Sequence, residues 1–519
     1  MKAVSTGPGM RQRNSRNTNL IRMQLSQARF AKIRLRAAHP VRSDPAAEPV
    51  DFVAAPAWRI PGTANMRRMT VVAIATMLVI PSALAIPPAF GQTAVATGPA
   101  PVAAKPAAPA PAAAATPAAH TPAIKQAAAS TPESRSAAAL ALSHEPTYDE
   151  GTAARIREAA LSYSDLAVRG GWPAIPADAK FAMGVAGPHD DLLRQRLMLS
   201  GDLAPDHATG PFDETLAEGL MRFQSRHGLA PTGILTPRTL AALNVPVQKR
   251  IKQLEASLER LENMNFQFGQ RYVVVNLPAT FAEAVENDKV VRRYRVIVGK
   301  TEKPSPTLVA EITSVILNPT WTVPSSIAKT EISAHMRKDP TYLSRMHMEV
   351  LDGRDMPIDP ASVDWSGTRT PNFTVRQQNG AWNALGAVKI DMPNPYSVYM
   401  HDTNQHNLFS DDYRFDSHGC SRVDNVRDLA NWLLQEEMAK WNRPAIDAAI
   451  ATGQHQEIAL PKKVPVAWIY LTAWMTRDQT IQFRNDIYNQ DEQLLEATAE
   501  EAAFFNKAGN HPLTAHLAQ

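Results

Sequence analysis

The sequence predicts an α+β protein of several domains, in which a small helical bundle precedes a β-rich sandwich with an inserted segment and the N-terminal region is disordered. Three observations support this prediction. The 519 residues are enough for about two to four domains. The Ala- and Pro-rich stretch from residue 86 to about residue 133 has a composition that cannot bury a core. Beyond it, apolar residues repeat at helical spacing as far as about residue 265 and with a period of two from Arg271 onward.

Residues 1–85 are predicted to be a leader that contains a signal peptide. Its apolar segment covers about residues 69–85 and follows Arg67 and Arg68. A basic region, an apolar stretch of about twelve residues and an Ala-x-Ala site at 83–85 are typical of secretion with cleavage. An uncleaved inner-membrane anchor is the alternative, but a membrane span needs about 20 apolar residues and Pro81 interrupts this run. We therefore expect export to the periplasm, with membrane contact only if the segment is uncleaved.

Residues 86–133 are predicted to form a disordered linker. They are mainly Ala, Pro and Thr with almost no charge, a composition that cannot bury a core. Residues 134–185 are predicted to be a helical region, because apolar residues between Ala153 and Leu166 repeat at helical spacing. The helix should end at the breaker cluster of residues 170–173.

A compact three-helix module is predicted over residues 186–245. Its helices should form around the apolar residues of 192–199, 212–229 and 232–243, with Gly and Thr between them. Residues 246–268 follow as an amphipathic connecting helix, in which apolar residues alternate with Lys, Glu and Arg at helical spacing.

The β-rich domain is predicted over residues 269–495, with a C-terminal tail at 496–519. The period of two predicts strands at 272–277, 280–285, 290–298, 308–316, 386–391 and 396–400. Residues 321–375 interrupt these strands with helix-like and turn-rich sequence. We expect this insertion to be a lid that gates substrate, with an ordinary surface insertion as the alternative.

The charge distribution argues against nucleic-acid binding. The formal net charge is only +4, and in the predicted folded part no cluster of Lys and Arg interleaves with aromatic residues. The sequence does not indicate an oligomeric state.

Cys420 is the only cysteine of the chain and lies in the string Ser417-His418-Gly419-Cys420-Ser421. A lone cysteine has no disulfide partner within the chain, and its polar neighbours argue against a small core residue. The thiolate is the reactive form, and a neighbouring imidazolium lowers the pKa of a thiol. The string therefore predicts a thiol nucleophile with a lowered pKa.

A second histidine, His401, lies at the end of a strand-like segment, fifteen residues before Ser417. This arrangement resembles the catalytic signature of L,D-transpeptidases of the YkuD type, a His followed at a similar interval by Ser/Thr-His-Gly-Cys. The segments 318–324, 383–389 and 483–488 resemble the large periplasmic members of that family. The order of motifs within 186–245 resembles the peptidoglycan-binding type 1 module.

The resemblance implies a cysteine-dependent acyl transfer in cell-wall biogenesis and cell shape, without metal or cofactor and sensitive to carbapenems. The thiolate would attack the peptide bond before the terminal D-residue of a tetrapeptide stem. Capture of the thioester by a side-chain amine of a neighbouring stem would give a 3→3 cross-link. Capture by water would give L,D-carboxypeptidase activity, and capture by a protein amine would attach that protein to the wall. The expected partners are peptidoglycan stem peptides and glycan.

The resemblance implies that Cys420 is the nucleophile and His401 the general base. His418 is assigned as a supporting residue, because residues i and i+2 of an extended segment project the same way without necessarily touching. Gly419 should leave the main-chain N–H groups of itself and of Cys420 open to an oxyanion. A carboxylate such as Asp402 could orient the histidine. The family uses a backbone carbonyl there, so Asp402 has no assigned role.

Four further residues are expected to contact substrate: Arg422, Ser417, Tyr399 and Trp321. The guanidinium could hold a stem carboxylate through two parallel hydrogen bonds. The alternative for Arg422 is a structural ion pair with Asp416 or Asp424.

Two other classes of protein are alternatives. A zinc peptidase could use His401, His406, His418 and Cys420 as ligands. Zinc cell-wall peptidases with the same binding module use a His-x-His pair, which this sequence lacks. A wall-binding or structural protein with a decayed site is the second alternative, although every element of the catalytic signature is present.

Overall fold

The computed structural model describes residues 131–366 and 372–509, with side chains described as far as residue 500. The predicted leader, the predicted linker as far as residue 130 and the last part of the predicted tail lie outside these residues. Among the described residues, none of the helices has the length and apolar character needed to cross a membrane.

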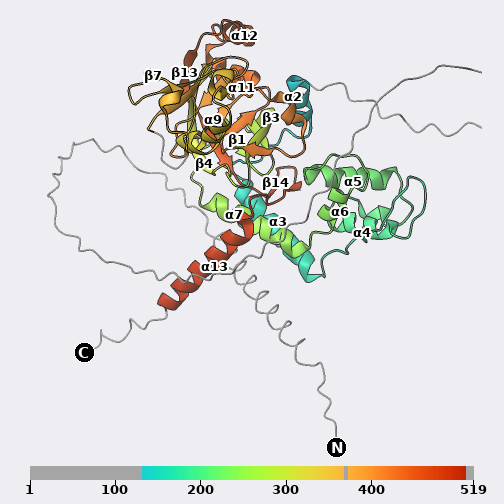
Figure 1. The fold of residues 1–519 in the computed structure, drawn as a ribbon. Helices are drawn as coiled ribbons and strands as arrows, with labels where there is room; N and C mark the ends of the chain where they lie inside the picture. Colours follow the sequence, from blue (N-terminus) through green and yellow to red (C-terminus); the bar gives the residue numbers. More distant parts are fainter. Residues whose placement is uncertain (1–130, 367–371, 510–519) are drawn as a thin grey trace, which may run out of the picture. The chain divides into compact units, whose positions relative to one another are not determined.

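Two helices open the described chain, α2 (Pro132–Ala141) and α3 (Thr152–Val168) (Figure 1). The α2 helix begins inside the predicted linker, because the Thr131 hydroxyl caps it by accepting from the Ser134 N–H. The α3 helix ends at the predicted breaker cluster, where Gly170 and Gly171 have φ of 101° and 72°. Residues 171–186 contain no helix, so the prediction of a helical region as far as 185 is wrong for this Gly- and Pro-rich part.

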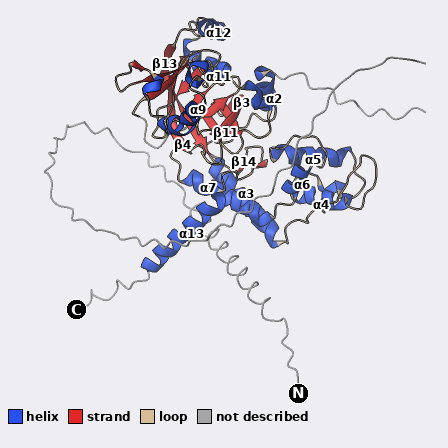
Figure 2. Cartoon of the chain, in the orientation of Figure 1, coloured by secondary structure: helices blue, strands red, loops and turns tan. Residues whose placement is uncertain are grey.

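The three predicted helices of the module are confirmed as α4 (Asp190–Leu199), α5 (Glu214–Arg226) and α6 (Pro237–Leu243). A single apolar cluster that includes Leu193, Leu216 and Phe223 joins them. The predicted connecting helix is α7 (Val247–Glu262), and it packs with α3 against one face of the β-rich domain. Figure 2 shows this change from helices to strands.

The β-rich domain is a nine-stranded sheet of order β11-β3-β12-β10-β9-β4-β13-β1-β2. Its strands are β1 (Arg271–Asn276), β2 (Phe281–Glu286), β3 (Lys289–Gly299), β4 (Leu308–Leu317), β9 (Val388–Asp391), β10 (Met400–His401), β11 (Phe415–Ser417), β12 (Ser421–Val423) and β13 (Gln456–Ile469). All six predicted strands appear, although β10 is much shorter than predicted. Because β2 also pairs with β3, the predicted sandwich closes on itself around an apolar core.

The insertion forms a separate subdomain with its own apolar core. Its sheet has the order β5-β8-β6-β7, with β5 (Trp321–Thr322), β6 (Met348–Leu351), β7 (Pro357–Ile358) and β8 (Thr374–Gln377). Its helices are α8 (Ser325–Ile327), the π-turn η2 (Ala328–Ile332), α9 (Ser333–Lys338) and α10 (Tyr342–Arg345). The sequence predicted the helices of this insertion but not its sheet.

The C-terminal part adds residues to the core of the nine-stranded sheet and to the apolar cluster around α3 and α7. The α11 helix (Val426–Leu433) buries Leu429, Ala430 and Leu433 in the core of the nine-stranded sheet, and α12 (Arg443–Ala451) follows it. The hairpin β14 (Ala473–Met475) and β15 (Ile481–Phe483) packs near α3 and α7. The last helix, α13 (Gln490–Gly509), extends into the predicted tail.

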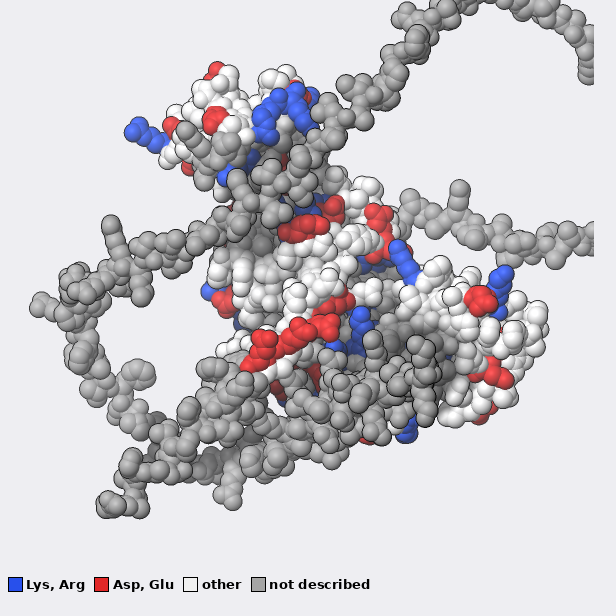
Figure 3. Space-filling model, turned by 60° about the horizontal axis from the view of Figure 1, so that its bottom comes forward, with Lys and Arg blue, Asp and Glu red and all other residues white. Residues whose placement is uncertain are grey.

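On the face shown in Figure 3, acidic and basic residues of the described part of the chain are interspersed. That face carries no continuous basic surface, in line with the small net charge of +4.

Candidate active site

The strand register places the two central residues of the predicted site on one face of the sheet. In the parallel pair of β10 and β12, Met400 lies opposite Ser421 and His401 opposite Arg422. Cys420, which immediately precedes Ser421, therefore lies beside Tyr399. Side chains two residues apart on a strand share a face. Hence Tyr399, His401, Cys420 and Arg422 all project on the same side, while Met400 points into the core.

The ring of His401 is oriented by a backbone carbonyl. Its Nδ1 lies 2.5 Å from the carbonyl oxygen of Asp402, which can only accept. The proton therefore belongs on Nδ1, and Nε2 keeps the lone pair that a general base needs. The carboxylate of Asp402 accepts instead from the Ala387 N–H at 2.9 Å. Asp402 thus contributes its main chain and not its side chain.

Both groups are held in their neutral forms. Burial raises the pKa of the Cys420 thiol to about 11, although the Tyr399 N–H and the charges of Lys389 and Arg422 oppose this. Burial, together with the charges of Arg422 and Lys389, lowers the pKa of His401 to about 3, against the effect of the Asp402 carbonyl. The expected lowering of the thiol pKa by an imidazolium is therefore wrong. Desolvation outweighs it, and His401 carries no charge at neutral pH.

A tight turn presents the thiol. Gly419 has φ of 114°, a value that a residue with a side chain adopts only under strain. The Ser417 hydroxyl closes the turn by donating to the Cys420 carbonyl at 2.5 Å and accepting from the Gly419 N–H at 3.2 Å. The Ser305 hydroxyl also donates to the Gly419 carbonyl at 2.8 Å.

The geometry of this turn differs from what we expected for Gly419 and for Ser417. The Gly419 N–H is occupied by Ser417, so it is not open to an oxyanion, whereas the Cys420 N–H has no hydrogen-bond partner among the described residues. Ser417 is 2% exposed and its hydroxyl serves the turn, so we no longer expect it to contact substrate.

Arg422 faces the site without an ion pair among the described residues. Its guanidinium donates to the Gln405 side chain at 3.2 Å. Asp424, one alternative partner, is bound by Arg135, and Asp416 acts on Arg422 only through the field of its charge. Burial lowers the pKa of Arg422, and the charge of Asp416 opposes this shift.

Tyr399 and Trp321, both expected to contact substrate, lie in contact with each other. Trp321 of β5 hydrogen-bonds the hydroxyl of Tyr399, whose pKa is raised by burial and by Cys420. The ring of Tyr399 lies edge-on to that of His401, with centroids 5.6 Å apart. On its other side, the Nζ of Lys389 lies 4.6 Å from the Tyr399 ring centroid. Lys389 was not predicted as a site residue, although the alternation of β9 could have placed it on this face.

His418 points toward the insertion. Its Nε2 lies 2.6 Å from the Glu331 carboxylate on η2, which Lys303 also approaches at 3.5 Å. Burial alone would raise the pKa of Glu331, but the hydrogen bond and charge of His418 and the charges of Lys303 and Lys300 keep it below its usual value. The structure therefore gives His418 a contact with the insertion.

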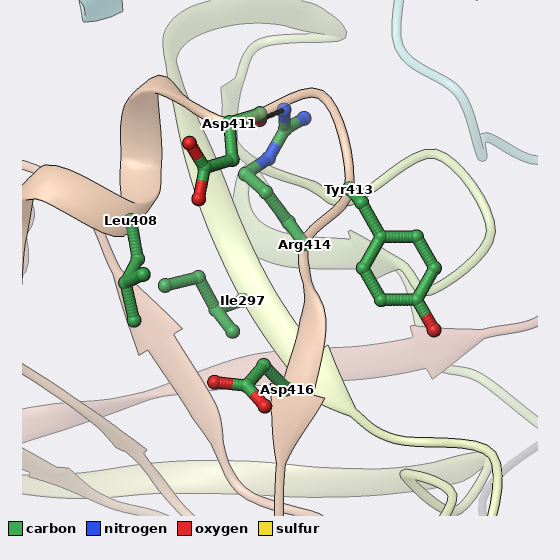
Figure 4. A pocket seen from close by; sticks show the side chains of 6 residues that line it. All are labelled: Ile297, Leu408, Asp411, Tyr413, Arg414 and Asp416. Atoms are coloured by element: carbon green, nitrogen blue, oxygen red, sulfur yellow. Dashed lines mark hydrogen bonds between the residues drawn. The ribbon is translucent and has the colours of Figure 1, made fainter. Parts of the chain in front are cut away.

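Two other features bear on ligands. Among the described residues, no three His, Cys, Asp or Glu side chains gather in a group that could hold a metal ion. A pocket of about 220 Å³ adjoins the site on its β3 side, because its Ile297 is the strand partner of Arg422. Figure 4 shows Asp411, Asp416 and Arg414 around it, with Arg414 donating to the Asp411 carbonyl at 2.9 Å.

Two segments of the chain match models of known protein families. Residues 270–454 match the family model described as L,D-transpeptidase catalytic domain (YkuD), and residues 190–243 match the one described as "Putative peptidoglycan binding domain". The chain therefore carries a catalytic domain of the L,D-transpeptidase family and a peptidoglycan-binding domain, as the resemblance implied.

Part of this chain is also similar in sequence to an individual protein. A curated relative from Haemophilus influenzae, named "Putative L,D-transpeptidase", is 30% identical over 224 residues, which cover 43% of this chain and 45% of the relative. The match thus spans less than half of either protein.

Solved L,D-transpeptidases from Xylanimonas cellulosilytica and Stackebrandtia nassauensis are 15% and 12% identical, and each match covers 57% of this chain. The matches cover 100% and 97% of the solved chains, with TM-scores of 0.19 and 0.22. With scores this low, the assignment depends on the match in sequence.

Proposed function

We propose that this protein is a periplasmic L,D-transpeptidase that forms 3→3 peptidoglycan cross-links through a thioester on Cys420. The main support is the orientation of His401. Its Nδ1 lies 2.5 Å from the Asp402 carbonyl, and its Nε2, which has no hydrogen-bond partner among the described residues, is available to the neighbouring thiol. The family assignment and the apolar segment predicted at residues 69–85 support the periplasmic location.

Acylation begins from a neutral pair. As the Cys420 sulfur attacks the carbonyl carbon before the terminal D-residue, its proton passes to Nε2 of His401. The carbonyl electrons move to oxygen, which the Cys420 N–H can stabilise. When the tetrahedral intermediate collapses, the C–N bond breaks and the leaving nitrogen takes the proton from His401. A free D-amino acid and a thioester result.

Transfer to the acceptor reverses these roles. A neighbouring stem's amine attacks the thioester and gives a proton to His401. The C–S bond then breaks, the sulfur takes the proton back, and the new amide is the cross-link. Arg422 is suited to hold a stem carboxylate, because its side chain faces the site without an ion pair among the described residues. We propose that the module at 190–243 keeps the enzyme on its polymeric substrate.

The proposal is tested by incubating the purified protein with disaccharide-tetrapeptides and analysing the products by mass spectrometry. We expect dimers that have lost one terminal D-residue and are linked between third residues. Tripeptide monomers alone would make water the acceptor and the protein an L,D-carboxypeptidase. Cross-linking by a Cys420→Ala variant would refute the thioester mechanism. Muropeptide analysis of a deletion strain extends the test to the cell wall.

A further inference from the structure

A lysine and an aspartate on β9 face the active site. In the antiparallel pair of β9 and β10, Lys389 lies opposite His401. The same register places Asp391 opposite Tyr399. Lys389 and Asp391 alternate with the buried Ile390 and so project on the site face. Two rows result across β12, β10 and β9: Arg422, His401 and Lys389 in one, and Cys420, Tyr399 and Asp391 in the other.

The two side chains form a compact pair of opposite charges at the edge of solvent. The Lys389 Nζ lies 2.7 Å from an Asp391 oxygen, and the side chains are 22% and 30% exposed. The Tyr399 ring supports the ammonium at 4.6 Å. A bound molecule can therefore reach both charges from one side, while the tyrosine fixes their position.

Their distance from the thiol selects a particular part of the substrate. Asp391 lies two strands from Cys420, which corresponds to about 10 Å. The side chain of a diaminopimelate residue extends about 6 Å beyond its α-carbon at ordinary bond lengths. Once that residue is bound to the sulfur, its distal end lies at about the distance of the Lys389–Asp391 pair.

We propose that Lys389 and Asp391 form a subsite for an amino-acid head group, which is the distal ammonium and carboxylate of a diaminodicarboxylic acid at the third position of the donor stem. This inference rests on the proposed function and specifies its substrate. The carboxylate binds Lys389 and the ammonium binds Asp391, so the internal ion pair widens into a closed set of four alternating charges. A lysine at the same position offers only the ammonium and leaves Lys389 without its second partner.

The test compares tetrapeptide donors that differ only at the third residue: meso-diaminopimelate, its distal carboxamide, and L-lysine. The readout is kcat/KM for release of the terminal D-residue. Because a hydrogen bond to a charged group contributes about 1.5–3 kcal/mol, the wild type should prefer the diacid by roughly 10- to 100-fold. Lys389→Met should bring the ratio of diacid to carboxamide close to one. A change in thiol reactivity affects both donors alike and cancels in this ratio.

A matched control is Lys463→Met, because Lys463 forms a 2.9 Å pair with Glu311 elsewhere on the same sheet. It should keep the wild-type ratio. Asp391→Asn should weaken turnover of all three donors, which share the ammonium. An unchanged ratio in Lys389→Met, or a wild type that turns over all donors equally, would overturn the subsite alone. A wild type inactive on every donor would overturn the proposed function and the subsite with it.

Discussion

In the proposed reaction Cys420 and His401 start as an uncharged pair, and burial and the two cations beside His401 contribute to this. Arg422 and Lys389 are its neighbours on the adjoining strands, and their charges disfavour a protonated imidazole. Burial adds to the effect on His401 and outweighs the same cations at the thiol. In the proposed mechanism the thiol proton therefore moves during the attack and not before it.

This leads to a prediction about pH. Because the pKa of Cys420 is raised to about 11, its thiolate fraction should grow about tenfold for each pH unit well below that value. Alkylation by iodoacetamide, followed by intact mass, should therefore accelerate steadily between about pH 7 and pH 10. Since Cys420 is the only cysteine, the mass reports this site alone.

His401→Ala should show the same rise with pH, because a neutral imidazole does not hold the thiolate. A rate that levels off below about pH 8 would indicate a preformed thiolate and imidazolium, contrary to this account.

The second residue-scale prediction separates the two histidines. A carbapenem offers a strained carbonyl, and incubation should add one drug mass to Cys420 and none to Cys420→Ala. His401→Ala should slow acylation by roughly 10²–10⁴-fold, the usual contribution of a general base. His418→Ala should slow it only about 2- to 5-fold, because His418 makes a partly exposed ion pair with Glu331.

Stopped-flow absorbance of the β-lactam gives the rates, and circular dichroism checks that both variants are folded. If His418→Ala is the more damaging variant, the assignment of the base is wrong.

At the scale of single residues, the sequence predicted which residues lie together better than it predicted their hydrogen bonds and protonation. The structure places Tyr399, His401, Cys420 and Arg422 on one face of the sheet, because the two segments of the motif run side by side. The inward turn of Ser417 and the carbonyl of Asp402 depend on main-chain direction, which spacing alone does not reveal. The raised thiol pKa depends on burial by the assembled sheet and on no adjacent residue.

Among the elements, the insertion contacts the Ser417–Cys420 segment through a carboxylate. Glu331 on η2 contacts both His418 and Lys303, which belong to separate loops of the sheet domain. A partly exposed pair of this kind contributes about 0.2–1 kcal/mol. Glu331→Gln should therefore raise hydrogen exchange across residues 325–345 by roughly 2- to 5-fold, as the insertion separates more often from the motif.

The matched control is Asp355→Asn, which removes a pair with Arg376 inside the insertion and should leave that exchange unchanged. Equal exchange in wild type and Glu331→Gln would show that the contact does not hold the insertion in place.

The α2 helix gives a second prediction for an element. Arg135 binds Asp424, four residues beyond Cys420, through two hydrogen bonds of 2.6 and 2.7 Å, and the two residues are 6% and 0% exposed. Arg135→Ala leaves a buried carboxylate without this partner, which typically costs about 3–5 kcal/mol. We expect a clear loss of stability in thermal unfolding and lower activity, because Asp424 directly follows β12 and the turn that carries Cys420 directly precedes it.

Deletion of residues 86–130 is the contrasting change and should leave activity on soluble muropeptides intact, because this Ala- and Pro-rich segment has no core composition. The deletion must stop before Thr131, which caps α2. Two results together would contradict this account: a deletion of residues 86–130 that loses activity, and an Arg135→Ala variant that is as stable as the wild type. Residues 86–130 would then be needed for function, and the Arg135–Asp424 pair would not stabilise the domain.

Sequence periodicity predicted most elements, and its failures have physical reasons. The strands β1 to β4 were visible because their apolar residues pack against the cores of the domain, those of β1 on both faces. The longest strand, β13, was missed because Pro461 and Pro465 argue against a central strand. The register shift between Ala459 and Val464 accommodates Pro461. The strands of the insertion have only two to four residues, too few for a period to appear.

For the molecule as a whole, the junction between the peptidoglycan-binding module and the catalytic domain is rich in buried arginines. Arg226 on α5 donates to the Ile481 carbonyl on β15, and Arg484 donates back to the Arg226 carbonyl. Burial and the charge of Arg226 lower the pKa of Arg196 and of Arg250 to about 9. Asp202 is the carboxylate that binds Arg226, at 2.5 and 2.6 Å.

Asp202→Ala should therefore loosen this junction. Burial alone would lower the pKa of Arg226, and the charge and hydrogen bonds of Asp202 raise it above its usual value. Without the carboxylate, Arg226 is a buried cation beside Arg196 and Arg250, and loss of one partner of such a pair costs about 3–5 kcal/mol. Thermal unfolding should begin earlier, and hydrogen exchange should rise first at residues 481–484, where Arg226 holds the Ile481 carbonyl.

Glu218→Ala is the matched control, because Glu218 pairs with Arg222 on the exposed side of the same helix at 3.8 Å. That change should alter stability by less than about 0.5 kcal/mol. If Asp202→Ala unfolds like the control, the arginines must be compensated in another way. If it is destabilised while exchange at 481–484 stays at the wild-type level, the module would unfold without disturbing the catalytic domain, and the junction would not couple them.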